Sequence, residues 1–220
     1  FAMMIDAFAH YHRRPPRSSI CRIATLASFA AQVLVPRLPE FRRQNPDIEI
    51  EFITSVRLVD LTREEADLGV RYGLGQYEGV VSMPLVKGTL SPVCAPAALA
   101  AAEGDLARLL AGTRRIQTAG YNEWRDWSAL AGIDLSQAEP ALVIEDFLVA
   151  IRAITLGQGI ALLPRILVQD LIDQGDLALF SDVLLPVDHT YHLAHTAASV
   201  RRQHVQTVVD WLRASLAHLN

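Results

Sequence analysis

Short apolar segments alternate with helical patterns along almost the whole chain after residue 20, and this alternation limits the possible folds most strongly. The apolar patterns predict strands at 21–26, 48–54, 66–72, 80–87, 90–94, 115–118, 141–145, 159–162 and 190–196. Helical spacing predicts helices at 28–44, 58–65, 96–102, 106–110, 123–131, 146–156, 164–172 and 200–219. Strands alternating with helices are typical of an α/β fold with a mostly parallel, covered sheet.

Several helices have clear boundary signals. Asp146 is a predicted N-cap, and Gly157 is a predicted stop for the same helix. Pro164 suits the first turn of the helix that follows it. Pro36 and Pro39 interrupt the pattern at 28–44, so we expect a kink or two short helices there.

The composition limits the class of protein. The chain has 220 residues, of which 51% are hydrophobic and 20% are charged, which suits one large domain or two small lobes. Its net charge of −4 makes it a poor candidate for binding nucleic acid over its whole surface. Cys21 and Cys94 each lie in an apolar run and are predicted to be buried free thiols, which fits a reducing cytosol.

The N-terminal part differs from the rest. Residues 13–19 combine arginine with proline and serine and are predicted to form a linker. Before them, residues 3–11 have helical spacing and resemble the end of a helix. The first twelve residues lack the apolar core of a signal peptide, and no apolar run, the longest being 94–102, is long enough to cross a membrane.

Common catalytic and cofactor motifs are missing. The Gly73-x-Gly75 and Gly157-x-Gly159 pairs lack the third glycine of a dinucleotide loop, and no phosphate-binding loop or nucleophile elbow is present. The histidines at 189, 192 and 195 would point to opposite sides of a strand, which argues against a metal site. The acidic pairs 64–65 and 145–146 are adjacent residues that splay apart. We therefore expect no cofactor, no metal and no enzymatic activity.

Two predicted helix starts favour an anion site. The strand at 21–26 leads into a helix near Ser28, whose free N–H groups and positive dipole end should face the carboxyl edge of the sheet. The helix after Asp146 begins in the same way in the second half of the chain. Ser28 is either an ordinary N-cap or a cap that also meets a ligand.

Several segments together resemble the effector-binding domain of LysR-type transcriptional regulators. They are Ser28-Phe29-Ala30, Leu34-Val35-Pro36-Arg37-Leu38-Pro39-Glu40-Phe41, Pro46-Asp47-Ile48, Leu58-Val59-Asp60-Leu61, Asp67-Leu68-Gly69-Val70-Arg71-Tyr72-Gly73, Leu90-Ser91-Pro92-Val93-Cys94-Ala95-Pro96, Trp124-x-x-Trp127 and Gly157-Gln158-Gly159-Ile160-Ala161-Leu162-Leu163-Pro164. The resemblance runs from about residue 21 to 216 and points to the branch of glycine-cleavage and muropeptide-sensing β-lactamase regulators.

The resemblance implies an α/β, two-lobed type II periplasmic-binding-protein-like fold, with the lobes joined by two crossing strands. Residues 1–19 would be the end of a linker helix and a linker, 20–92 with 190–220 lobe I, and 93–189 lobe II. The family's N-terminal winged helix-turn-helix is absent from this sequence, so DNA would be bound only through that separate domain.

The resemblance also implies an effector site in the cleft between the lobes. The candidate residues are Ala27, Ser28, Phe29, Val56, Arg57, Tyr72, Gln117, Thr118, Tyr121, Asp146, Phe147 and Leu163. Ordinary alternatives stay open: Arg57 is a solvated surface residue, the residues around 117–121 are a polar turn, and Trp124 and Trp127 are core. Phe147 departs from muropeptide-sensing relatives, which suggests a smaller or more apolar ligand.

The expected function is that of a cytoplasmic ligand-sensing module, which binds a small anionic or zwitterionic metabolite. We expect a homodimer or tetramer in which the basic helix with Arg37, Arg42 and Arg43 meets the acidic residues Asp170, Asp173 and Asp176 of another chain. The main alternative is a periplasmic solute-binding protein of a transport system, and a second is an enzyme on the same fold. The basic linker and the Val-Pro-Arg-Leu-Pro segment argue against transport.

Overall fold

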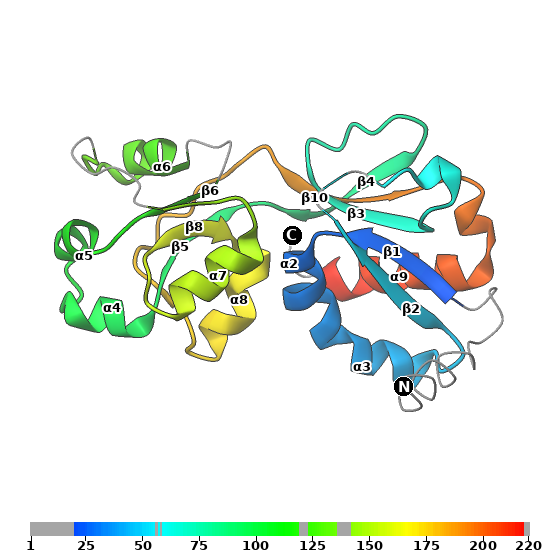
Figure 1. The fold of residues 1–220 in the computed structure, drawn as a ribbon, viewed down its shortest axis with the longest axis horizontal. Helices are drawn as coiled ribbons and strands as arrows, with labels where there is room; N and C mark the ends of the chain where they lie inside the picture. Colours follow the sequence, from blue (N-terminus) through cyan, green and yellow to red (C-terminus); the bar gives the residue numbers. More distant parts are fainter. Residues whose placement is uncertain (1–19, 56, 58, 119–122, 136–141, 218–220) are drawn as a thin grey trace, which may run out of the picture.

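The computed structural model describes residues 20–55, 57, 59–118, 123–135 and 142–217. Figure 1 shows two groups of helices and strands side by side, joined by extended segments. One group contains a five-stranded sheet, and the other contains a three-stranded and a two-stranded sheet. We call these groups the first and the second lobe.

The sheet of the first lobe has the strand order β2-β1-β3-β10-β4. Its strands are β1 (Ile20–Thr25), β2 (Glu49–Thr54), β3 (Leu68–Gly73), β4 (Val81–Lys87) and β10 (Thr190–His195). β1 pairs in parallel with β2 and β3, whereas β10 pairs antiparallel with both β3 and β4. The carboxyl ends of β1, β2 and β3 therefore lie at one edge of this sheet.

One helical run follows β1 without interruption. It consists of α2 (Ala27–Phe29), a π-helical segment η2 (Ala30–Leu34) and α3 (Val35–Gln44). We expected either a kink or two short helices at Pro36 and Pro39. The run is not split into two helices at these prolines. The run instead contains the π-helical segment directly before α3, and Arg37 Nη1 donates to the carbonyl of Val33 at 2.8 Å.

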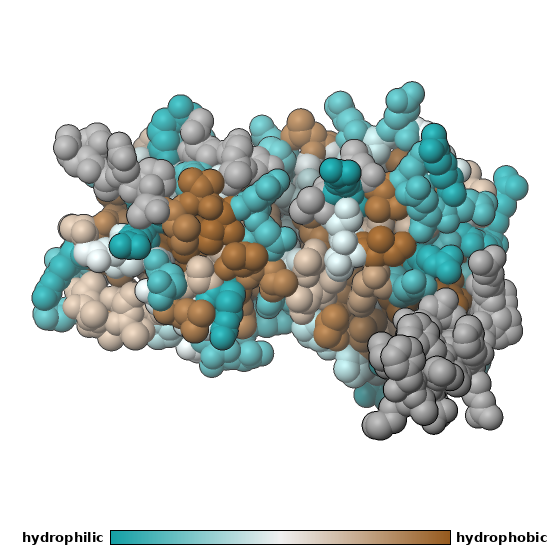
Figure 2. All heavy atoms as spheres, in the orientation of Figure 1, coloured by the Kyte–Doolittle hydropathy of each residue, from teal (hydrophilic) through white to brown (hydrophobic). Residues whose placement is uncertain are grey.

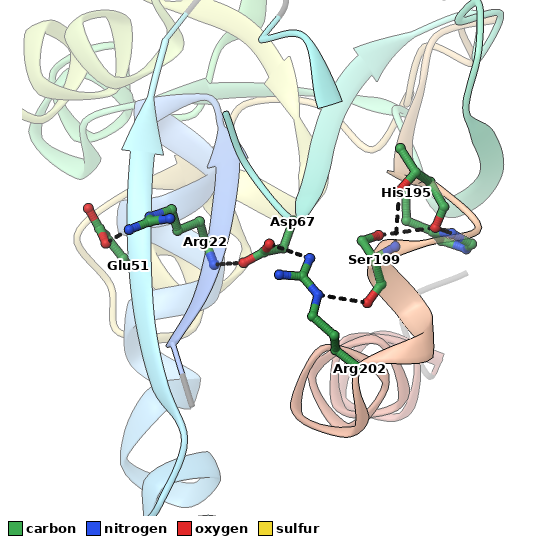
Figure 3. A network of polar contacts seen from close by, with 7 residues as sticks. Arg22, Glu51, Asp67, His195, Ser199 and Arg202 are labelled. Carbon is green, nitrogen blue, oxygen red and sulfur yellow. Dashed lines mark hydrogen bonds and ion pairs between the residues drawn. The ribbon is translucent and has the colours of Figure 1, made fainter. Parts of the chain in front are cut away.

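The helix α9 (Gln203–Leu216) covers one face of this sheet, and a polar network holds its start in place (Figure 3). Arg202 Nη2 lies 2.6 Å from Asp67 Oδ1, while the backbone N–H of Arg22 donates to Asp67 Oδ2 at 2.7 Å. Arg22 also pairs with Glu51 at 3.2 Å. Because Asp67 precedes β3, this network lies at the opposite end of the parallel strands from the α2 helix start.

The second lobe is built around β5, which pairs antiparallel with both of its neighbours. Its strands are β5 (Leu90–Cys94), β8 (Ala161–Pro164), β9 (Ala178–Leu179), β6 (Ile116–Thr118) and β7 (Leu142–Ile144). Its helices are α4 (Pro96–Ala101), α5 (Leu106–Gly112), α6 (Glu123–Ala131), α7 (Phe147–Thr155) and α8 (Arg165–Asp173). β6 and β7 pair in parallel.

Three expectations from the sequence are wrong in detail. The sheets are not mostly parallel, because the chain leaves the first lobe through β4 and returns through β10, and a returning strand runs in the opposite direction. A helix was expected at 58–65, but the described residues 59–65 contain only η3 (Leu61–Arg63), a 3₁₀ turn capped by Asp60. The strand expected at 159–162 lies at Ala161–Pro164.

The helix boundary signals of α7 are confirmed. Asp146 Oδ1 accepts hydrogen bonds from the backbone N–H groups of Leu148 at 2.7 Å and Val149 at 3.3 Å. Gly157 has a φ of +72°, and this left-handed conformation ends the helix at little cost for glycine. The local signals therefore set both ends of this helix.

A single apolar cluster runs through both lobes. It includes Ile23 and Phe29 from the first lobe with Phe147 and Leu163 from the second. A second cluster lies within the second lobe and contains Trp124 and Trp127, which confirms that these two rings belong to the core. Among the described residues, no helix is long and apolar enough to cross a membrane.

Candidate functional site

The site lies where α2 and α7 meet at the boundary between the lobes (Figure 1). α2 starts directly after the carboxyl end of β1, and α7 starts at its Asp146 cap. α2 of the first lobe contacts α7 of the second lobe, and the ring of Phe147, the first residue of α7, lies 5.8 Å from that of Tyr72 in the first lobe. Free backbone N–H groups and the positive ends of helix dipoles favour an anion at such a place.

An aromatic cluster fills this boundary. The ring of Tyr72, at the end of β3, lies 5.8 Å from Phe147, 4.8 Å from Tyr191 and 5.4 Å from His189. The ring of Phe29 lies 4.6 Å from Tyr191. Phe29 and Phe147 are both buried. The boundary is therefore packed closed by rings in this structure, and Phe147 stands in it.

The predicted capping role of Ser28 is wrong. Leu26 occupies the N-cap position of α2, no side chain caps this helix end, and Ser28 lies within the first turn. Ser28 is only 1% exposed. The signal was misread because the helix starts one residue before Ser28, so that its hydroxyl cannot act as the cap.

Thr25 is a residue that our sequence analysis missed. It is the last residue of β1, it is fully buried, and its Oγ1 has no hydrogen-bond partner among the described residues. Its side chain follows Cys21 and Ile23 on the face of β1 that packs into the shared core. A hydroxyl at the end of an otherwise apolar strand was the signal that could have identified it.

Gln117 and Thr118 form a polar network with Glu123. Thr118 Oγ1 donates to Glu123 Oε1 at 2.6 Å, and Gln117 Nε2 donates to Glu123 Oε2 at 2.6 Å. Thr118 and Glu123 are both buried. These hydrogen bonds join the end of β6 to the start of α6 and involve Glu123, which sequence reasoning missed.

The other candidate residues occupy different environments. Leu163 is a fully buried core residue of β8, and Ala27 is half-buried at the start of α2. Arg57 is exposed, and its backbone carbonyl accepts a hydrogen bond from Arg71 at 2.8 Å. Val56 and Tyr121 lie outside the described residues.

The histidines and cysteines have structural surroundings. The rings of His192 and His195 contact the backbone carbonyls of Thr190 and Thr196. Within the described ranges, no group of three or more His, Cys, Asp or Glu side chains could hold a metal ion. Cys21 and Cys94 are buried free thiols, as predicted, and burial raises the pKa of Cys21 strongly and that of Cys94 to about 11.

The fold defines the class of protein first: a two-lobed domain of the periplasmic-binding-protein-like type. A family model described as "LysR substrate binding domain" matches residues 15–217. The chain therefore belongs to this family and is an effector-binding domain of the LysR type. The resemblance found in the sequence is confirmed, and the alternative of a transport protein has no support.

Similar proteins agree with this assignment. The transcriptional activator AmpR of Rhodobacter capsulatus is 28% identical over 203 residues, which cover 90% of this chain and 67% of that protein. The glycine cleavage system transcriptional activator of Escherichia coli K12 is 25% identical over 197 residues, covering 89% and 64%. The effector domain of AmpR of Pseudomonas aeruginosa has a similar fold, with a TM-score of 0.75 and 22% identity over 91% of this chain and 96% of that one. The chain thus spans about two thirds of the length of these curated relatives.

Proposed function

We propose that this domain senses a small anionic or zwitterionic metabolite at the boundary between its lobes. The observation that carries the proposal is the contact between α2 and α7 at the lobe boundary, together with the buried, unpaired hydroxyl of Thr25 at the end of β1, just before α2. The helix starts supply N–H groups and a positive potential for a carboxylate. Thr25 and Ser28 supply hydroxyl groups close to the end of β1.

Ligand entry requires a rearrangement of the boundary, because aromatic rings fill it. Phe147 and Tyr72 pack across it, and both belong to the core shared by the lobes or pack against it. A ligand therefore competes with this ring packing and favours a state in which the lobes have moved apart or the Phe147 ring has turned. Such a shift between two states is the means by which binding would be reported to the rest of a regulator.

We propose further that the domain acts in a cytoplasmic transcriptional regulator, without catalysis or a cofactor, and contacts DNA only through a separate domain. The relatives named above are transcriptional activators, which supports a regulatory rather than an enzymatic role. The fragment itself should show no sequence-selective binding to duplex DNA at physiological salt. A sub-micromolar selective complex would contradict this part of the proposal.

Assembly into a homodimer or a tetramer is also proposed. Arg42 and Arg43 on α3 and Asp173 at the end of α8 are exposed, and Asp173 Oδ1 accepts a hydrogen bond from Gln169 Nε2 at 2.6 Å. Arg37 instead lies 3.9 Å from Asp170 of its own chain, so this part of the expected pairing is made within one chain. Figure 2 shows apolar surface on the second lobe, where β7 and α7 expose Leu142, Val143 and Val149.

The dimer is tested by sedimentation of the parent and of charge-reversal variants at tens of micromolar. Arg42→Glu and Asp173→Arg should each weaken association, and the double variant should recover part of it. A parent that sediments only as a monomer would contradict the proposal, and so would single reversals without effect.

The ligand site is tested by a thermal-shift screen with amino acids, aromatic acids and cell-wall fragments, followed by calorimetry. Thr25→Val and Ser28→Ala should each weaken binding of a confirmed ligand by roughly 10- to 150-fold, because a hydrogen bond to a charged group is lost. Ser28→Ala should leave the fold intact, since Ser28 caps no helix. If both variants bind like the parent, the ligand does not lie at the lobe boundary.

A further inference from the structure

A cavity of about 590 Å³ lies on the face of the five-stranded sheet opposite α9. Its floor is a row of small residues on three neighbouring strands, Ala24, Gly69 and Ala194. Its walls are the segment around η3 and the loop between β3 and β4, both of which lie above the sheet in Figure 1. The volume is that of a small-molecule site, and none of the described residues of the lobe-boundary site lines it.

The loop wall of this cavity is held in a defined position. Gly75 has a φ of +79°, and a Cβ atom there would come within 2.3 Å of His192 Nε2. Glycine is therefore required for the loop to lie this close to β10. Gly79, in the same loop, has a φ of +74°. The wall is thus a built part of the fold rather than a loose segment.

The buried charged residue that lines the cavity is Arg71, which lies two residues after Gly69 on the same face of β3. Arg71 is only 6% exposed. Nη1 donates to the carbonyl of Ser55 at 2.5 Å and Nη2 to that of Arg57 at 2.8 Å. In the part of the chain that the structure describes, no carboxylate forms an ion pair with Arg71.

Carbonyl groups orient this guanidinium but do not neutralise its charge. A buried cation without a counter-ion is costly, and burial accordingly lowers the pKa of Arg71. A planar guanidinium with free N–H groups is also well suited to a carboxylate, which it can bind with two parallel hydrogen bonds. Arg71 is therefore a preorganised anion-binding group that faces an accessible cavity.

The side chains around Arg71 favour a ligand that has an apolar part beside its carboxylate. Tyr77 lines the cavity near Arg71: burial raises the pKa of its hydroxyl, and the Arg71 charge opposes this rise. Val59, Leu61 and Val80 supply apolar walls.

The cavity also carries negative charge. Asp60 and Glu78 line it as well, and both are exposed. Asp60 is partly neutralised by Arg63 at 3.2 Å, whereas no ion pair is formed by Glu78 among the described residues. A cationic group on the ligand therefore has acidic partners at the cavity rim.

We propose that this cavity is a second ligand site, separate from the lobe boundary, which binds an apolar α-amino acid. The ligand carboxylate binds Arg71 and the Tyr77 hydroxyl. Its side chain packs against Val59, Leu61 and Val80, and its ammonium group lies near Glu78. The proposal does not depend on the function of the lobe boundary.

Isothermal titration of the 220-residue chain with L-leucine tests this proposal, with two matched probes. L-Leucinamide lacks the carboxylate, and isocaproate lacks the ammonium group. L-Leucine should bind saturably, leucinamide should show no binding, and isocaproate should bind more weakly. In the Glu78→Gln variant the difference between leucine and isocaproate should become smaller.

Two variants locate the binding. Arg71→Gln removes the charge but keeps an amide that can donate to the same carbonyls, and it should weaken leucine binding by about 10-fold or more. Ala194→Leu fills the floor without a change of charge and should also reduce binding, which keeps the test valid if Arg71→Gln fails to fold. Arg213→Gln makes the same chemical change as Arg71→Gln at an exposed position of α9, on the other face of the sheet, and it should bind leucine like the parent.

Three results would overturn the proposal. They are the absence of saturable binding by the parent up to about 10 mM leucine, equal binding of leucine and leucinamide, and a loss of binding in Thr25→Val but not in the folded cavity variants. The last result would assign leucine to the lobe boundary and leave that site intact.

Discussion

Replacement of Thr25 by valine should stabilise the ligand-free domain, although it removes a polar group from the sheet. The side chain is fully buried, and Oγ1 has no hydrogen-bond partner among the described residues. The backbone carbonyl of Thr25 accepts from the N–H of Ser55 at 3.0 Å, so that only the hydroxyl is unpaired. Valine has nearly the same shape and keeps the β-branch that suits a strand.

The expected gain follows from the cost of the buried hydroxyl. A hydroxyl buried without a partner costs about 1–3 kcal/mol on scales derived from protein variants. Small shifts of the surrounding atoms relieve part of this cost in the parent, so we expect the free energy of unfolding to rise by only about 1 kcal/mol. For a domain of this size, that corresponds to an increase in Tm of about 2–4 °C.

Thr118→Val is the matched control. Thr118 is also a buried threonine, but its Oγ1 donates to Glu123 Oε1 at 2.6 Å. Valine there leaves a buried carboxylate without one of its donors, and this should lower the free energy of unfolding by about 1.5–3 kcal/mol. The same chemical change should therefore have opposite signs at the two positions.

Urea unfolding, followed by circular dichroism without ligand, measures both variants. The midpoint should rise for Thr25→Val and fall for Thr118→Val, with an unchanged dependence on urea concentration. If Thr25→Val is destabilised as strongly as Thr118→Val, the Thr25 hydroxyl is paired in the free domain. Its assignment as an open ligand contact would then be refuted.

Three further predictions concern other parts of the molecule. Phe147→Ser should lower the free energy of unfolding by about 3 kcal/mol, because a buried ring that contacts Tyr72 is lost. Calorimetry should also show a change in which ligands bind, and unchanged stability and ligand preference would contradict the packed boundary. Burial and the nearby Arg202 lower the pKa of His204 below its ordinary value of 6.5, so the unfolded chain binds a proton at this site more readily than the folded domain does. The free energy of unfolding should therefore decrease as the pH falls below 6.5. Urea titrations at several pH values should show a smaller decrease for His204→Gln, and a pH profile identical to that of the parent would exclude His204 as the source. Cys21 and Cys94 should react with a thiol reagent only after denaturation, because they are buried thiols with raised pKa values, and rapid labelling of the native domain would disprove their burial.

Local sequence signals predicted the individual elements well. The cap at Asp146 and the stop at Gly157 describe interactions between residues a few positions apart, so the sequence contains all that they need. The burial of Trp124 and Trp127 followed from helical spacing in the same way. The start of α2 was misplaced because serine is a common N-cap residue, and the sequence does not show that the helix already begins at Ala27.

The candidate site was predicted only in part, because it depends on contacts between distant segments. The sequence pointed to the helix starts after β1 and at Asp146, and the structure brings α2 and α7 into contact. It did not reveal that Phe147 packs on Tyr72 and closes the boundary, nor that Thr25 lacks a partner. An unpaired hydroxyl can be recognised only after all possible partners have been placed.

The sequence by itself determined the family and most of the succession of strands and helices, apart from the short β9 and the helix expected at 58–65. The tertiary structure alone decided the direction of β10, the closed packing between the lobes and the cavity over Arg71. In the sequence, Arg71 is part of a family motif at the end of a strand. Its buried position and its carbonyl partners, at Ser55 and Arg57, arise from segments about fifteen residues away. Local patterns are set by neighbouring side chains, whereas the environment of a buried charge is set by whatever the fold packs around it.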